Sequence, residues 1–195
     1  MAIRESTASC VYELDQQLRL RAAGSGWNEF ALENGASDLV WPRPLGHPLL
    51  MYLSDATTVQ LYELLFARVT REQRPITFPI RCDGPTRRRH LSLTMTTAPA
   101  AGYVISTTLL HSEPRSPIAF LDRTVERRGR IPVAVCGWCG RLNVDGQWVE
   151  VEQALLSQRL FDRLHPPPLT NTICNACRDF MLALLVDDAT VNGSS

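Results

Sequence analysis

The chain has 195 residues with 20 basic and 20 acidic side chains, and every basic residue is an arginine. The lack of lysine excludes chemistry that needs a lysine amine, such as a Walker phosphate loop, a kinase strand lysine or a Schiff base. The longest apolar run, residues 180–186, is far shorter than the roughly 18 residues of a membrane span, and the first ten residues lack the apolar stretch of a secretory signal. We therefore expect a cytoplasmic protein with no membrane partner.

Charge is unevenly distributed along the chain. Residues 1–130 carry 16 arginines against 13 acidic residues, a net charge of +3, whereas residues 131–195 carry 4 arginines against 7 acidic residues, a net charge of −3. Nucleic-acid-binding domains usually present a basic surface. The distribution argues against a nucleic-acid partner, most clearly for the C-terminal part.

The first elements of the chain are predicted to be short strands and helices. Residues 11–15 and 18–22 have period-2 character and predict a hairpin. Apolar residues at helical spacing from residue 27 predict a helix that ends at Asn34. A longer helix is predicted over residues 57–74, capped by Ser54 or Asp55. Its buried stripe is expected to comprise Val59, Tyr62, Phe66 and Val69.

Three more strands are predicted to complete this part, over residues 76–82, 91–96 and 103–110. The basic run Arg87–His90 falls between the first two, and we interpret it as a solvated hairpin turn, with a contact for an acidic partner or phosphate as the alternative. Because strands and helices do not alternate throughout, a parallel sheet is excluded. The order predicts an α+β fold, a five-stranded antiparallel sheet with helices on one face.

The element order resembles that of a PAS sensory domain over about residues 9–112. GWNEFALENGA is similar to the first helix after the second strand, PLGHPLLMYLSD to the segment before the long helix, and PITFPIRCDGPTRRRHLSLTM to the first hairpin of the last three strands. The chain is also similar to bacterial proteins in which such a domain precedes a C-x-W-C knuckle. The resemblance implies a sensor or docking domain that pairs as a homodimer.

The resemblance also implies an apolar interior that could enclose a ligand. The candidate lining residues are Trp27, Phe30, Tyr62, Phe78, Cys82 and Met95. A flavin is disfavoured because the cysteine signature of flavin-binding relatives is absent, and haem is disfavoured because the long helix contains no histidine. We favour a filled interior, and therefore a docking platform, because no polar group stands out to orient a ligand.

Four of the six cysteines form two C-x-x-C pairs, Cys136 with Cys139 and Cys174 with Cys177. Two thiolates at this spacing can bind one ion when the backbone between them turns tightly, which Gly137 and Gly140 permit. A knuckle, a hairpin turning at Asp145-Gly146 and a helix carrying the second pair form a treble-clef-like layout. We predict one structural zinc ion.

Two alternatives to structural zinc stay open: thiol–disulfide chemistry, and another metal or no site. The 34 residues between Cys139 and Cys174 exceed the usual spacing, and an inserted helix over residues 151–164 would account for the excess. Thioredoxin-like sites place tryptophan before the first cysteine, whereas Trp138 lies between the two, which weakens the redox interpretation. His165 is expected to be a surface residue.

The predicted organisation is a PAS-like domain (9–112), a connector with a short helix from residue 117 to 129 (113–131), a zinc module (132–187) and a disordered tail (188–195). We predict a non-enzymatic signalling or regulatory protein that acts through a protein partner. The first alternative is a zinc-finger regulator of transcription or RNA. The second is a thiol-redox switch that uses the C-x-x-C pairs.

Overall fold

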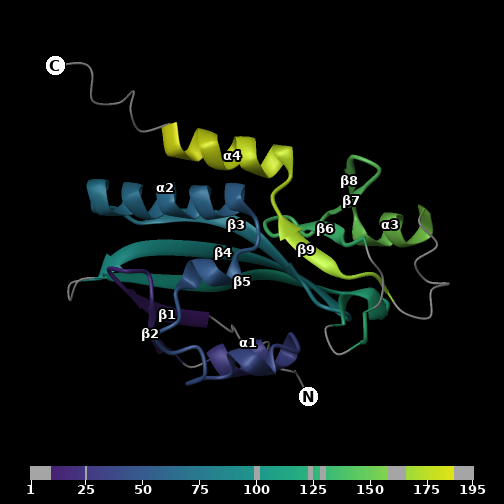
Figure 1. The fold of residues 1–195 in the computed structure, drawn as a ribbon, viewed down its shortest axis with the longest axis horizontal. Coiled ribbons are helices and arrows are strands. Elements are labelled where there is room, and N and C mark those ends of the chain that lie inside the picture. Colours follow the sequence, from purple (N-terminus) through teal and green to yellow (C-terminus); the bar gives the residue numbers. More distant parts are fainter. Residues whose placement is uncertain are drawn as a thin grey trace.

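A computed structural model describes residues 10–24, 26–98, 102–122, 125–127, 131–157 and 166–186. The expected tail, His165 and parts of the expected connector helix and inserted helix lie outside these ranges. The described chain forms a five-stranded and a four-stranded sheet with four α-helices (Figure 1). None of the described helices has the length and apolar character needed to cross a bilayer.

The larger sheet is antiparallel and has the strand order β2-β1-β5-β4-β3. Its strands are β1 (Cys10–Asp15), β2 (Leu20–Ala23), β3 (Ile76–Asp83), β4 (Arg87–Ala98) and β5 (Gly102–Pro114). The register aligns Tyr12, Ile105, Met95 and Ile76 across four strands. Since paired residues share a face of a sheet, this row defines the face that carries the core.

Both helices of the N-terminal part pack on that face. Trp27 of α1 (Trp27–Glu33) contacts the Tyr12 ring edge-on at 5.3 Å, and Phe66 of α2 (Ala56–Glu72) contacts the ring of Tyr103 at 4.7 Å. Asp55 caps α2, accepting a 2.8 Å hydrogen bond from the amide of Thr58. The predicted α+β architecture with a five-stranded antiparallel sheet is therefore present.

The buried stripe of α2 agrees in part with the predicted one. Phe66 and Val69 are buried as predicted, whereas Val59 and Tyr62 are only partly buried and Leu61 and Leu65 take their places at 2% exposure or less. A second helix, α4 (Asn175–Val186), covers another side of α2, where the Arg68 guanidinium donates to the carbonyl of Leu184. The helical pattern alone could not reveal this second neighbour.

The basic run Arg87–His90 is not a turn, so that expectation is wrong. These residues begin β4 and pair with the end of β3, for example His90 with Arg81 and Arg88 with Asp83. The turn lies at residues 84–86. The prediction began β4 four residues late because the arginines and the histidine of this run were interpreted as solvated loop residues. In the structure, acidic side chains from other segments compensate the charge of Arg88 and Arg89.

The smaller sheet has the strand order β8-β7-β6-β9. Its strands are β6 (Val133–Cys136), β7 (Leu142–Val144), β8 (Gln147–Val149) and β9 (Leu169–Thr172). β7 and β8 form the predicted hairpin, with Asp145 and Gly146 both at positive φ. Helix α3 (Val151–Ser157) follows β8, and β9 runs parallel to β6. β9 was not predicted.

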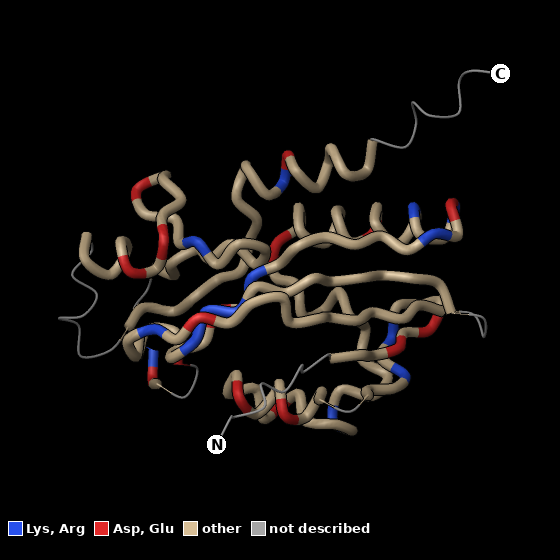
Figure 2. Tube along the Cα trace, turned by 180° about the vertical axis from the view of Figure 1, so that it is seen from behind, with Lys and Arg blue, Asp and Glu red and all other residues tan. Residues whose placement is uncertain are grey.

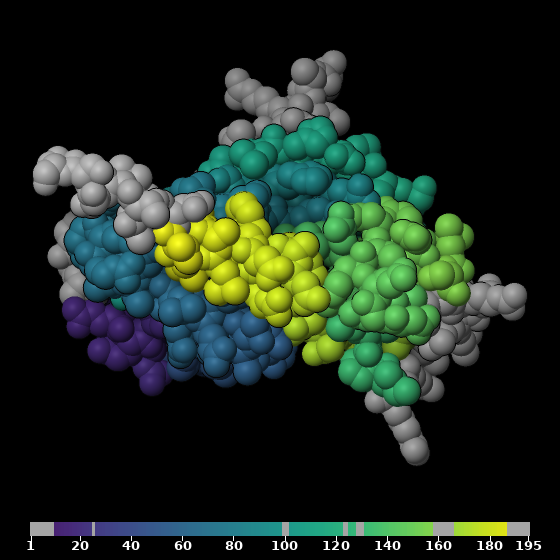
Figure 3. Space-filling model, turned by 90° about the horizontal axis from the view of Figure 1, so that it is seen from above, coloured from purple at the N-terminus to yellow at the C-terminus, as the bar shows by residue number. Residues whose placement is uncertain are grey.

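The expected connector contributes to the core. β5 extends to Pro114, and the described part beyond it contains only a short 3-10 turn (Ala119–Leu121). Ile118 and Phe120 are at most 4% exposed and pack with Leu142, Val151 and Leu155 of the C-terminal part. A larger cluster joins Leu65, Phe78 and Met95 to Trp138, Cys174 and Met181. Figure 3 shows α4, in yellow, lying over α2 and beside the smaller sheet.

Candidate metal centre

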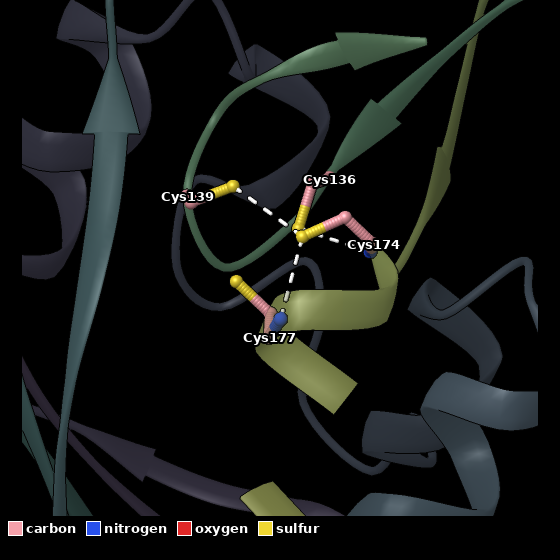
Figure 4. Close-up of side chains that lie close together, drawn as sticks. All are labelled: Cys136, Cys139, Cys174 and Cys177. Atoms are coloured by element: carbon pink, nitrogen blue, oxygen red, sulfur yellow. Dashed lines mark hydrogen bonds between the residues drawn. The ribbon is translucent and has the colours of Figure 1, made fainter. Parts of the chain in front are cut away.

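The four cysteines of the two C-x-x-C pairs converge on one point (Figure 4). Cys136 ends β6 and Cys139 lies in the turn before β7, whereas Cys174 directly precedes α4 and Cys177 lies in its first turn. Cys136 and Cys174 are 1% exposed, and the other two are partly exposed. Because β6 and β9 run parallel, their C-terminal ends lie at the same end of the sheet. Cys136 is the last residue of β6 and Cys174 follows the end of β9 by two residues, so the two C-x-x-C motifs meet there.

The sulfur geometry fits a tetrahedral ion. All four Sγ atoms lie within 4.8 Å of one another, and those of Cys139 and Cys174 are 3.8 Å apart. A tetrahedron with metal–sulfur distances of about 2.3 Å has edges of about 3.8 Å. A disulfide needs about 2.05 Å, so this spacing suits thiolates around an ion, and the cluster could hold a metal.

Backbone groups shape and polarise the cluster. Gly140 has φ +69° and donates its amide to the carbonyl of Cys136 at 2.9 Å, which closes the knuckle turn. The amide of Cys174 donates to Cys136 Sγ at 3.4 Å, and the amide of Cys177 donates to Cys174 Sγ at 3.4 Å. Amide donors stabilise negative charge on sulfur, so the turn favours thiolate ligands.

Without a cation, three of the thiols have opposed pKa shifts. A hydrogen bond from Cys139, supported by backbone amides, lowers the pKa of Cys136. The same contact raises the pKa of Cys139, and burial raises the pKa of Cys177 to about 12. The cluster therefore favours ionisation of Cys136 and disfavours ionisation of Cys139 and Cys177. A divalent cation would remove this conflict because it compensates several thiolates together.

The knuckle is attached to the edge of the larger sheet. The amide of Arg81 in β3 donates to the carbonyl of Trp138 at 2.7 Å. A Cβ at Gly140 would lie 3.0 Å from Arg81 Nε, so glycine also allows this approach. Trp138 is 5% exposed, and its ring lies 5.7 Å from that of Tyr62 in α2. The cysteine cluster therefore rests directly on the N-terminal part.

A group of six charged residues, the ion-pair cluster, joins the same two parts beside the knuckle (Figure 2). Its members are Arg81, Asp83, Arg88, Arg115, Glu150 and Glu152. Asp83, 4% exposed, accepts from Arg81 and Arg115 at 2.9 Å each. Glu150 lies 2.8 Å from Arg81, and Glu152 pairs with Arg88 at 3.1 Å and with Arg115. Arg88 of the predicted basic run thus balances acidic residues of the C-terminal part.

A cleft of about 270 Å³ lies between α2, the knuckle and β9. Tyr52, Ser54 and Tyr62 contribute one side, and Trp138 and Asn171 contribute the other. Two of its walls are therefore segments that lead into the cysteines. Its existence depends on contacts between residues more than 70 positions apart, which no local sequence pattern reveals.

Of the six residues expected to line a ligand cavity, Phe78 and Met95 belong to the larger core cluster, and Trp27 and Tyr62 pack against it. Phe78 and Met95 are at most 1% exposed in the core, and Tyr62 lines the cleft. The Trp27 indole donates to the carbonyl of Leu39 at 2.6 Å, and Phe30 is partly buried in α1. Cys82 lies 3.8 Å from the Asn34 amide oxygen, and burial raises its pKa.

Sequence reasoning also missed a histidine pair. His90 and His111 pair across β4 and β5 next to a β-bulge, and both lie within 4.0 Å of the Glu113 carboxylate. Both histidines are substantially exposed. Their alignment follows from the register of two strands, and no motif in the sequence indicates it.

The chain matches no protein-family model, and no curated protein is significantly similar to it in sequence. The fold and the cysteine cluster are therefore interpreted from their own geometry.

Proposed function

We propose that this protein is a non-enzymatic signalling or regulatory protein, built from a PAS-like sensor or docking domain and a structural zinc site. The observation that carries the proposal is the attachment of the four-cysteine cluster to the larger sheet, through the Arg81–Trp138 hydrogen bond and the ion pairs that Glu150 and Glu152 form with Arg81, Arg88 and Arg115. A structural change in either part would therefore alter its contacts with the other part. The five-stranded antiparallel sheet and its helices agree with the PAS-like architecture.

Zinc is the proposed ion because four thiolates in a tetrahedron are its typical structural ligand set. Four protein ligands leave no open position for a substrate or a reactive water, so the ion would contribute folding energy and not catalysis. The cytosol keeps such thiols reduced, which agrees with the proposed cytoplasmic location.

The output is proposed to pass to a protein partner, with the PAS-like domain as the homodimer contact. Two other functions remain alternatives: a zinc-finger regulator bound to nucleic acid, and a thiol-redox switch. The net −3 charge of residues 131–195 weighs against the first. The second would require the cysteines to exchange zinc for disulfides in response to an oxidant.

Affinity isolation of the tagged full chain tests the proposal, with Cys139→Ser as the metal-site variant and Cys10→Ser as the matched control. We expect one zinc per chain by native mass spectrometry, and a defined protein partner that survives nuclease treatment and is lost from Cys139→Ser alone. Co-isolated nucleic acid that accounts for all captured protein would contradict the proposal in favour of the zinc-finger alternative. Reversible disulfides with zinc release under mild oxidant would favour the redox switch.

A further inference from the structure

The cleft between α2 and the knuckle has an unusual lining for a surface depression. It contains aromatic rings from Tyr52, Tyr62 and Trp138, with hydroxyl and amide groups from Ser54, Thr58 and Asn171, and no ionised side chain. Burial raises the pKa of Tyr62 to about 12, so its phenol stays neutral at physiological pH. Ligand pockets typically combine apolar walls with a few polar groups that fix orientation.

Neutral hydrogen-bond donors also line the cleft. The hydroxyls of Ser54 and Tyr62 and the side-chain amide of Asn171 belong to lining residues, and each of these groups can donate a hydrogen bond. The indole Nε1 of Trp138 is buried, so Trp138 contributes its ring and not its N–H. The cleft therefore favours a molecule with a carbonyl or a similar acceptor.

The charge and size of the cleft define the ligand further. An ionic ligand would lose hydration and find no countercharge among the lining residues, which is unfavourable. A flat ring can stack or pack edge-on against the tyrosine and tryptophan rings. At about 270 Å³ the cleft lies just below the range of drug-sized pockets, so the ligand is small.

We propose that this cleft binds a small, uncharged, planar molecule carrying a hydrogen-bond acceptor, and that it does so only when the cysteine cluster holds its metal. The dependence on metal follows from the walls. Trp138 lies between Cys136 and Cys139, and Asn171 lies three residues before Cys174. Loss of the ion would release both walls, so ligand and metal stabilise each other's binding. The proposal rests on the proposed sensory function and gives it a ligand class and a location.

The test uses the zinc-loaded full chain labelled with ¹⁵N and two probes of the same shape, neutral benzamide and anionic benzoate. The chain has four tryptophans, and the Trp138 indole signal is assigned as the one missing from Trp138→Phe. We expect benzamide to shift that signal saturably and benzoate to bind at least tenfold more weakly. Equal binding of the two probes, or no saturable shift of Trp138 by benzamide, would overturn the proposal.

Two tryptophan substitutions provide the matched comparison. Ser54→Trp fills the mouth of the cleft and should weaken benzamide binding at least tenfold, whereas Met51→Trp, at a 61% exposed position of the preceding turn, should leave it unchanged. Asn171→Phe blocks the opposite wall and replaces Ser54→Trp if that variant does not fold. Unchanged binding in a folded blocking variant would locate the probe elsewhere and refute the assignment.

Metal linkage is measured by competition with a zinc chelator. At a benzamide concentration three times its Kd, the apparent zinc affinity should rise about fourfold if only the metal-loaded form binds. An unchanged zinc affinity would refute the linkage. None of these readouts involves a protein partner. Benzamide binding without any captured partner would therefore retain the cleft and reject the proposed signalling output.

Discussion

Asp83 holds the two arginines, Arg81 and Arg115, that pair with Glu150 and Glu152 of the C-terminal part. Its carboxylate is 4% exposed and hydrogen-bonded to Arg81 and Arg115, whose side chains are 10% and 6% exposed. Removal of one partner from a buried ion pair costs about 3–5 kcal/mol, because the remaining charge is left uncompensated. Arg81 keeps Glu150 and Arg115 keeps Glu152, so we expect Asp83→Ala to cost about 3 kcal/mol, near the lower limit of that range.

Urea unfolding of the zinc-saturated protein, followed by circular dichroism, measures this cost. Asp83→Asn retains the side-chain shape and one acceptor and should fall between wild type and Asp83→Ala. The control is Asp179→Ala, because Asp179 is 64% exposed and pairs with its neighbour Arg178, an arrangement worth at most about 1 kcal/mol. If Asp83→Ala and Asp179→Ala lose the same stability within about 0.5 kcal/mol, Asp83 does not support the ion-pair cluster.

Three further predictions concern the metal, acid and the core. Cys174→Ser should lose zinc and unfold the region around α4, since metal binding worth about 10–16 kcal/mol is coupled to folding; full zinc retention by atomic absorption would contradict this. Partial burial opposes ionisation of Glu150 and Glu152, but other contacts outweigh it. Arg81 lowers the pKa of Glu150, and the backbone amide of Glu152 together with Arg115 lowers the pKa of Glu152. This stabilisation is present above the unfolded pKa of about 4.3 and is lost as pH falls through the lower folded values. The stability difference between wild type and Glu150→Gln/Glu152→Gln should therefore shrink from pH 6 to pH 3, and a constant difference would refute the assignment. Met95→Trp should overpack the core and cost about 1–3 kcal/mol, and an unchanged Tm would instead indicate a hollow interior.

The sequence by itself determined the elements whose signals are local. Alternation in β3, the Asp55 cap and the Asp145-Gly146 turn each depend on neighbouring residues, and each was predicted close to its observed position. The convergence of the two C-x-x-C motifs was also predictable, because four thiols at these spacings form a typical ligand set for one metal ion.

Only the tertiary structure decided how the two parts of the chain meet. The run Arg87–His90 looked like a solvated turn because its acidic partners, Glu150 and Glu152, are more than 60 residues away. Contacts between distant segments also determine which side of α2 is covered, because α4 packs on it. They form the cleft as well, whose walls come from α2, the knuckle and β9. Charge compensation and burial depend on which segments become neighbours, and that is fixed by the register of the sheets and not by the spacing of residues along the chain.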